Sequence, residues 1–116
     1  MNKLVAVVFL LPAVCLAASV VRTLDAPDTN ISGLAWGAGT LWALDESSCY
    51  AYELDPETGD VQESFYVEHS VCSTYDPAGL AYSDDVLFSS FHSSTSSSYI
   101  IFTSPTGSYL GYDCLC

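Results

Sequence analysis

Gly33-Leu34-Ala35-Trp36 and Gly79-Leu80-Ala81-Tyr82 are two copies of one pattern, 46 residues apart. The likeness continues downstream, where Leu41-Trp42 aligns with Leu87-Phe88 and, after a two-residue insertion, Thr58-Gly59 aligns with Thr106-Gly107. Self-similarity at a period of roughly 20 to 50 residues is typical of repeat architectures. The sequence therefore predicts two structurally equivalent units.

Strand-like runs surround these motifs. Runs of β-branched and aromatic residues are separated by Gly, Pro, Asp and Ser, and helical periodicity is almost absent. The predicted strands are Ser19–Leu24, Ile31–Trp36, Thr40–Leu44, Cys49–Leu54, Val61–Val67, Ala78–Tyr82, Val86–Phe91, Tyr99–Thr103 and Tyr109–Cys114. The predicted fold is therefore all-β. Each repeat supplies four short strands, which is the number that one antiparallel β-propeller blade requires.

The first repeat carries a family resemblance. Its segments Gly33–Trp36, Leu41–Asp45 and Tyr52–Val61 resemble a blade of the secreted propellers related to NHL repeats, streptogramin lyase and the propeller-type glutamine cyclotransferases. The second repeat departs from this pattern at Phe91–Ser98, where a Ser-rich stretch replaces the usual Asp-containing turn. The motif is specific for a blade but not for a function, because such blades serve enzymes, lectins and scaffolds alike.

The resemblance implies a particular domain organisation. Residues 18–116 would form two four-stranded antiparallel propeller-type blades, one over about 31–67 and one over about 77–114. Ser19–Leu24 would add an extra outer strand. Glycines allow close backbone approach, and large aromatic residues fill the space between sheets. The residues predicted to pack between blades are Gly33, Trp36, Trp42, Gly79, Tyr82 and Phe88.

The N-terminus has the features of a signal peptide. Lys3 supplies a positive start, Leu4–Leu16 is apolar, and small residues follow at Ala17 and Ala18. We expect residues 1–17 to be removed and the rest to be secreted or periplasmic. No later apolar run is long enough for a membrane span.

The charge balance excludes one class of partner. The chain has 14 acidic residues against two basic ones, for a formal net charge of −12. Beyond Lys3 the sole Lys or Arg is Arg22. Because nucleic-acid binding requires several cations to neutralise phosphates, we expect no nucleic-acid partner.

Four cysteines remain after the predicted cleavage, namely Cys49, Cys72, Cys114 and Cys116. An even number in an exported chain favours disulfides, and four cysteines allow three connectivities. Cys49 and Cys72 flank a strand and are suitably placed to connect loops of the first repeat. A bond between Cys114 and Cys116 would be strained, which leaves an interchain bond open. The spacing matches no zinc motif.

No catalytic set is evident. The two histidines, His69 and His92, have no nucleophile elbow beside them. Ca²⁺ is a weaker possibility at the acidic turns formed by Asp45, Glu46, Asp55, Glu57 and Asp60, because carboxylates on loops suit a hard cation. The alternating Asp loop of dedicated calcium sites is missing. We therefore expect no enzyme activity, cofactor or resident metal.

Two blades cannot close a propeller ring, for which four to eight blades are typical. The sequence thus favours a non-enzymatic exported module for binding or assembly, completed by self-association or by a protein partner. Its tyrosines, Tyr50, Tyr52, Tyr66, Tyr75, Tyr99, Tyr109 and Tyr112, also allow a glycan partner. The alternative hypothesis is a truncated or divergent fragment of a propeller lyase or cyclotransferase.

Overall fold

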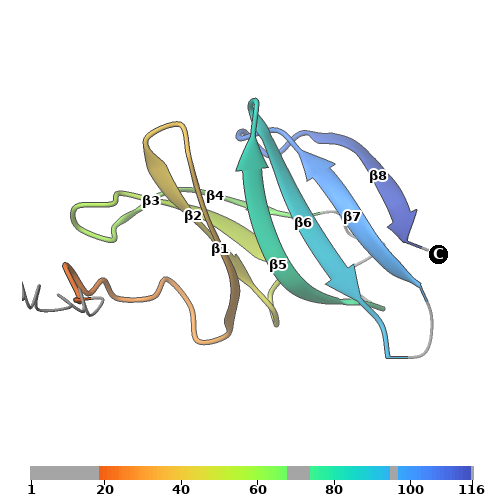
Figure 1. Cartoon of the computed structure of the whole chain (residues 1–116), viewed down its shortest axis with the longest axis horizontal. Helices are drawn as coiled ribbons and strands as arrows, with labels where there is room; N and C mark the ends of the chain where they lie inside the picture. Colours follow the sequence, from red (N-terminus) through yellow and green to blue (C-terminus); the bar gives the residue numbers. More distant parts are fainter. Residues whose placement is uncertain (1–18, 68–73, 95–96, 116) are drawn as a thin grey trace, which may run out of the picture.

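The computed structural model describes residues 19–67, 74–94 and 97–115, and these form two four-stranded antiparallel sheets (Figure 1). The first sheet contains β1 (Ile31–Gly37), β2 (Thr40–Asp45), β3 (Tyr50–Leu54) and β4 (Val61–Tyr66). The second contains β5 (Asp76–Ser83), β6 (Val86–His92), β7 (Ser98–Thr103) and β8 (Tyr109–Leu115). The all-β prediction with two such sheets is confirmed, and the described residues contain no helix.

Each sheet is a meander in which spatial order follows chain order. The first hairpin of each sheet turns through two residues with positive φ, Ala38-Gly39 in one and Asp84-Asp85 in the other. Two-residue turns of this kind match the right-handed twist of the strands that they join. The repeated sequence therefore produces the same opening hairpin twice.

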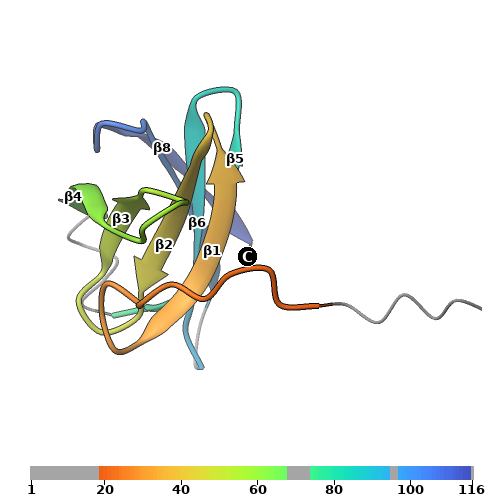
Figure 2. The ribbon, with the colours of Figure 1, turned by 90° about the vertical axis from the view of Figure 1, so that its left-hand side faces the viewer.

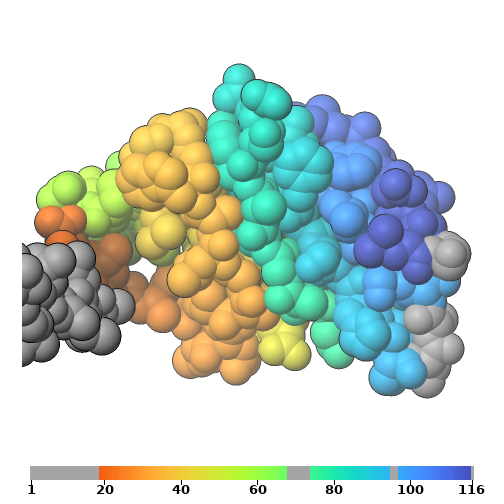
Figure 3. All heavy atoms as spheres, in the orientation of Figure 1, coloured from red at the N-terminus to blue at the C-terminus, as the bar shows by residue number. Residues whose placement is uncertain are grey.

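The two sheets pack face to face through β1 and β5, which lie side by side in Figures 1 and 3. A Cβ on Gly33 would lie 2.8 Å from the backbone nitrogen of Leu80, and one on Gly37 would overlap the ring of Tyr82. Tyr82 also stacks on Trp42, with ring centroids 6.0 Å apart and an interplanar angle of 13°. Small residues on β1 thus allow β5 to approach closely.

We call the faces that meet in this way the inner faces and the opposite ones the outer faces. The core lies between the inner faces, where Leu44, Ala51, Val67, Phe91 and Ile101 are buried. Because side chains alternate along a strand, Leu41 and Ala43 of β2 point to the outer face of the first sheet. The alternation leaves each sheet with a second apolar face.

The predicted N-terminal strand at Ser19–Leu24 is wrong. Residues 19–30 form no strand and instead cross the outer face of the first sheet, as Figure 2 shows. The segment approaches the face of the sheet rather than an edge, so its backbone finds no ladder partner. Val20 and Val21 remain 83% and 94% exposed. We refer to residues 19–30 as the strap.

Candidate binding faces

The outer face of the first sheet is apolar and only partly covered. Leu34 and Trp36 on β1 are 60% and 61% exposed. Ala43 and Leu54, further across the same face, are buried beneath the strap. Exposed large side chains at adjacent positions on one sheet face indicate an interaction surface.

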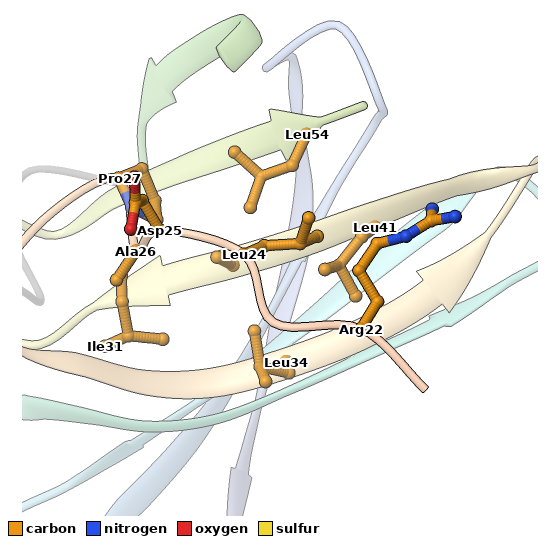
Figure 4. A pocket seen from close by; sticks show the side chains of 10 residues that line it. Arg22, Leu24, Asp25, Ala26, Pro27, Ile31, Leu34, Leu41 and Leu54 are labelled. Carbon is orange, nitrogen blue, oxygen red and sulfur yellow. The ribbon is translucent and has the colours of Figure 1, made fainter. Parts of the chain in front are cut away.

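A cleft of about 490 Å³ lies between the strap and this face (Figure 4). Leu24 extends from the strap toward the sheet, Arg22 lies at one end, and Ala26 and Pro27 lie at the other. The sheet side of the cleft is lined by Ile31, Leu34, Leu41, Ala43 and Leu54. The lining is mostly aliphatic, so the cleft suits apolar groups.

Polar contacts hold the strap at both ends of this cleft. Arg22 pairs with Glu57 at 2.9 Å and donates to the carbonyl of Pro56 at 2.8 Å. Further along, the Tyr52 hydroxyl donates to Asp28 at 3.0 Å. Desolvation by burial, together with the nearby Asp28 carboxylate, raises the pKa of Tyr52. The strap is therefore attached through these side chains and through one backbone hydrogen bond, which the Glu46 N–H donates to the Asn30 carbonyl at 2.8 Å, rather than through a strand ladder.

The outer face of the second sheet has a similar apolar character. A shallow hollow of about 260 Å³ there is lined by residues that include Gly79, Ala81, Phe88 and Ile100. Phe88 packs edge-on against Phe102, with ring centroids 5.5 Å apart. Residues 19–30 cross the first sheet, so the strap does not cover this hollow.

The predicted packing residues therefore divide into two groups. Gly33, Trp42 and Tyr82 meet between the two sheets. Trp36, Gly79 and Phe88 lie on the outer faces instead. The sequence did not identify Leu34 or the strap residue Leu24 as packing residues, although the alternation in Gly-Leu-Ala-aromatic already places Leu with the aromatic residue on one face.

The carboxylate of Asp45, the first residue of the acidic turns, is occupied by contacts within the chain. Asp45 is fully buried and accepts backbone hydrogen bonds from Asn30, Ser47 and Ser48, the last at 2.7 Å. Desolvation raises the pKa of Asp45, but these hydrogen bonds outweigh it and hold the pKa below its usual value. The described residues contain no group of three or more potential metal ligands.

Two further acidic residues of this candidate site, Asp55 and Glu57, have partners within the chain. Asp55 accepts hydrogen bonds from the backbone of Glu57 and Thr58, which closes the turn between β3 and β4. Glu57 pairs with Arg22. These two carboxylates therefore stabilise one turn and the strap.

The structure describes one of the two histidines and two of the four cysteines that the sequence analysis considered. His92 is exposed, and its Nδ1 lies 3.2 Å from Ser98 Oγ, while His69 lies outside the described residues. Neither the buried Cys49 nor Cys114 on β8 is a free thiol. Because Cys72 and Cys116 lie outside the described residues, the pairing of the cysteines stays a prediction. The predicted signal peptide also lies outside them.

Several tyrosines contact one another, and Tyr66, Tyr75 and Tyr99 all pack against the core between the sheets. Tyr50 contacts Tyr52 and Tyr66 in the first sheet. Tyr99 contacts Tyr75 and Tyr112. A hydrogen bond with Tyr75 raises the pKa of Tyr99.

Comparison of the chain with protein-family models, with curated proteins and with solved structures finds no match. The resemblance to propeller blades therefore remains a prediction from the motifs. Among the described residues, no helix is long and apolar enough to cross a membrane.

Proposed function

We propose that this protein is a non-enzymatic, exported module of propeller type that binds proteins through the outer faces of its two sheets. The observation that carries the proposal is the exposure of Leu34 and Trp36 on one outer face and of the Phe88 hollow on the other. The exposed residues on each outer face belong to one repeat of the sequence, and the corresponding residues of the other repeat are buried between the two sheets. Each therefore has the composition of an interface core.

Sheet faces of this kind select apolar and aromatic partners. A large aromatic residue at the centre of an interface contributes strongly to affinity when it is desolvated. Trp36 supplies such a residue on the first sheet, and the space around Phe88 accepts one on the second. The acidic surface then limits non-specific contacts through charge repulsion.

Panning a library of displayed short peptides on the purified protein tests this function. We expect enrichment of peptides rich in aromatic and aliphatic residues. Binding should be lost in the double variant Trp36→Arg/Ala81→Arg, which alters both outer faces. The variant Ser108→Arg, at an exposed turn position, is the matched control and should bind as the unmodified protein does. Equal binding to the double variant would contradict the proposal.

A further inference from the structure

The contact between the two sheets provides a template for a contact between two molecules. On the second sheet, Leu80 and Tyr82 dock against Gly33 and Gly37 of β1, and Tyr82 stacks on Trp42. The first sheet thus offers small residues and a flat aromatic ring. The second sheet supplies a leucine and an aromatic ring two residues further along.

Both halves of this contact recur on the outer faces. By the 46-residue offset, Leu34 and Trp36 correspond to Leu80 and Tyr82, and they are exposed. By the same offset, Gly79 and Phe88 correspond to Gly33 and Trp42, and they line the hollow on the second sheet. One molecule therefore presents the inserting half on its first sheet and the receiving half on its second.

We propose that the occupant of these faces is a second copy of this chain, bound head to tail. Leu34 and Trp36 of one copy would dock on the hollow around Gly79, Ala81 and Phe88 of the next copy, as Leu80 and Tyr82 dock on β1 inside each chain. The strap would keep its place beside this contact, over Ala43 and Leu54. This inference rests on the proposed function and names the partner of the same faces. The contact is heterologous, so the copies form a ring if the rotation closes and an open chain if it does not.

One difference between the repeats affects how tightly the second copy binds. Ser83 occupies the position that corresponds to Gly37, where a Cβ would overlap the docked ring of Tyr82. The side chain of Ser83 therefore obstructs the place that Trp36 of a second copy would take. We expect Ser83→Gly to lower the Kd for self-association several-fold.

Two variants that each block one face test the head-to-tail geometry. Trp36→Arg blocks the inserting half, and Ala81→Arg blocks the receiving half while leaving Phe88 in place. Both substitutions make the protein less acidic, so added charge repulsion cannot explain a loss of association. Far-ultraviolet circular dichroism verifies that each variant is folded, and Ser108→Arg serves as the control.

Sedimentation velocity over a range of concentrations then gives the result. We expect the unmodified protein and Ser108→Arg to associate, and each blocked variant alone to associate roughly 30-fold more weakly or worse. An equimolar mixture of the two blocked variants should form a 1:1 dimer, because one intact half remains on each. If Trp36→Arg is unfolded, Leu34→Arg replaces it.

Other outcomes would overturn the inference. A mixture that stays monomeric, or a blocked variant that still associates with itself, rules out the head-to-tail contact. The same holds if the unmodified protein is monomeric at every concentration and Ser83→Gly does not associate. If self-association fails but the proposed function is correct, the outer faces should still bind the selected peptides. Loss of self-association can therefore be distinguished from failure of the proposed function.

Discussion

Asp45 is a buried carboxylate at the end of β2, and its hydrogen bonds close the turn into β3. Replacing it with Asn removes the charge while keeping the shape. We expect the free energy of unfolding at pH 7 to fall by about 2 kcal/mol, because hydrogen bonds to a charged group are the stronger class. Chemical denaturation measures this change, and Glu46→Gln, at an exposed neighbouring position, should have little effect.

The pH dependence of stability provides a second measurement on Asp45. Its pKa is lower in the folded protein than its ordinary value of 3.8. The stabilisation is therefore complete above pH 3.8 and is lost as the pH falls through the lower folded value. Asp45→Asn should flatten the acid limb of the stability curve. An unchanged acid limb would show that other carboxylates control acid unfolding.

Ser89 carries the one buried side-chain polar atom without a hydrogen-bond partner in the described part of the chain. Its counterpart in the first sheet is Ala43, which is fully buried. Removing an unsatisfied buried hydroxyl relieves a desolvation penalty. We expect Ser89→Ala to raise the free energy of unfolding by about 1 kcal/mol and to raise the Tm.

The neighbouring residue Ser90 supplies the control for this prediction. Its hydroxyl donates to the carbonyl of Gly79 at 3.4 Å. Ser90→Ala therefore removes a hydrogen bond, whereas Ser89→Ala removes the cost of burying an unpaired hydroxyl. Thermal unfolding should place Ser90→Ala at or below the unmodified protein. A lower Tm for Ser89→Ala would mean that its hydroxyl is hydrogen-bonded in solution.

At the scale of elements, the strap depends more on Leu24 than on its ion pair. Arg22 and Glu57 are both well exposed, so their salt bridge contributes little in water. Leu24 is half-buried in the cleft and contacts Gly59, where a Cβ would lie 3.2 Å from Leu24 Cβ. Removing this apolar side chain from water therefore stabilises the strap more than the exposed ion pair does.

Leu24→Ala should therefore release the strap while leaving the sheets folded. Amide hydrogen exchange in residues 22–30 should accelerate, and the free energy of unfolding should fall by about 1 kcal/mol. Val21→Ala is the matched control, because Val21 is 94% exposed and its truncation should leave exchange unchanged. Equal exchange rates in Leu24→Ala and the unmodified protein would show that polar contacts alone hold the strap.

The sequence predicted the strands well because period-2 alternation and turn residues act locally. Both features are strong around Gly33–Trp36 and Gly79–Tyr82. The strap was mistaken for a strand because its apolar run satisfies the same local rule, while the choice between a sheet edge and a sheet face depends on tertiary packing. The role of Asp45 could not be predicted from the sequence either, since its partners are backbone groups of a turn that forms only in the fold.

The candidate site was predictable in type but not in location. The repeated motif indicated which residues pack between sheets. Each of these positions occurs once in each repeat, but a single chain buries only one copy of the motif between its two sheets. Trp36 is left exposed because nothing in the described chain packs on it as Trp42 packs on Tyr82. Local patterns identify packing residues, whereas their burial depends on how many sheets are stacked.

For the whole molecule, charge opposes the proposed self-association. Each copy has a formal net charge of −12, so two copies repel one another at low ionic strength. Salt screens this repulsion, with a Debye length of about 10 Å at 0.1 M. We expect the Kd for self-association to decrease several-fold as NaCl is raised from low to physiological concentration, as measured by sedimentation. Weaker association at higher salt would instead indicate that ion pairs form the contact.

The meander order of each sheet has a consequence for how the chain folds. Every strand pairs with its neighbour in sequence, so each hairpin requires only a short loop to close. Hairpins of this kind form in about 1 to 10 μs. The docking of β5 on β1 joins residues that are far apart in the chain, and such non-local contacts are the slow ones. The rate-limiting step should therefore be the meeting of two preformed sheets, and Gly33 and Gly37 are the residues whose substitution should slow it.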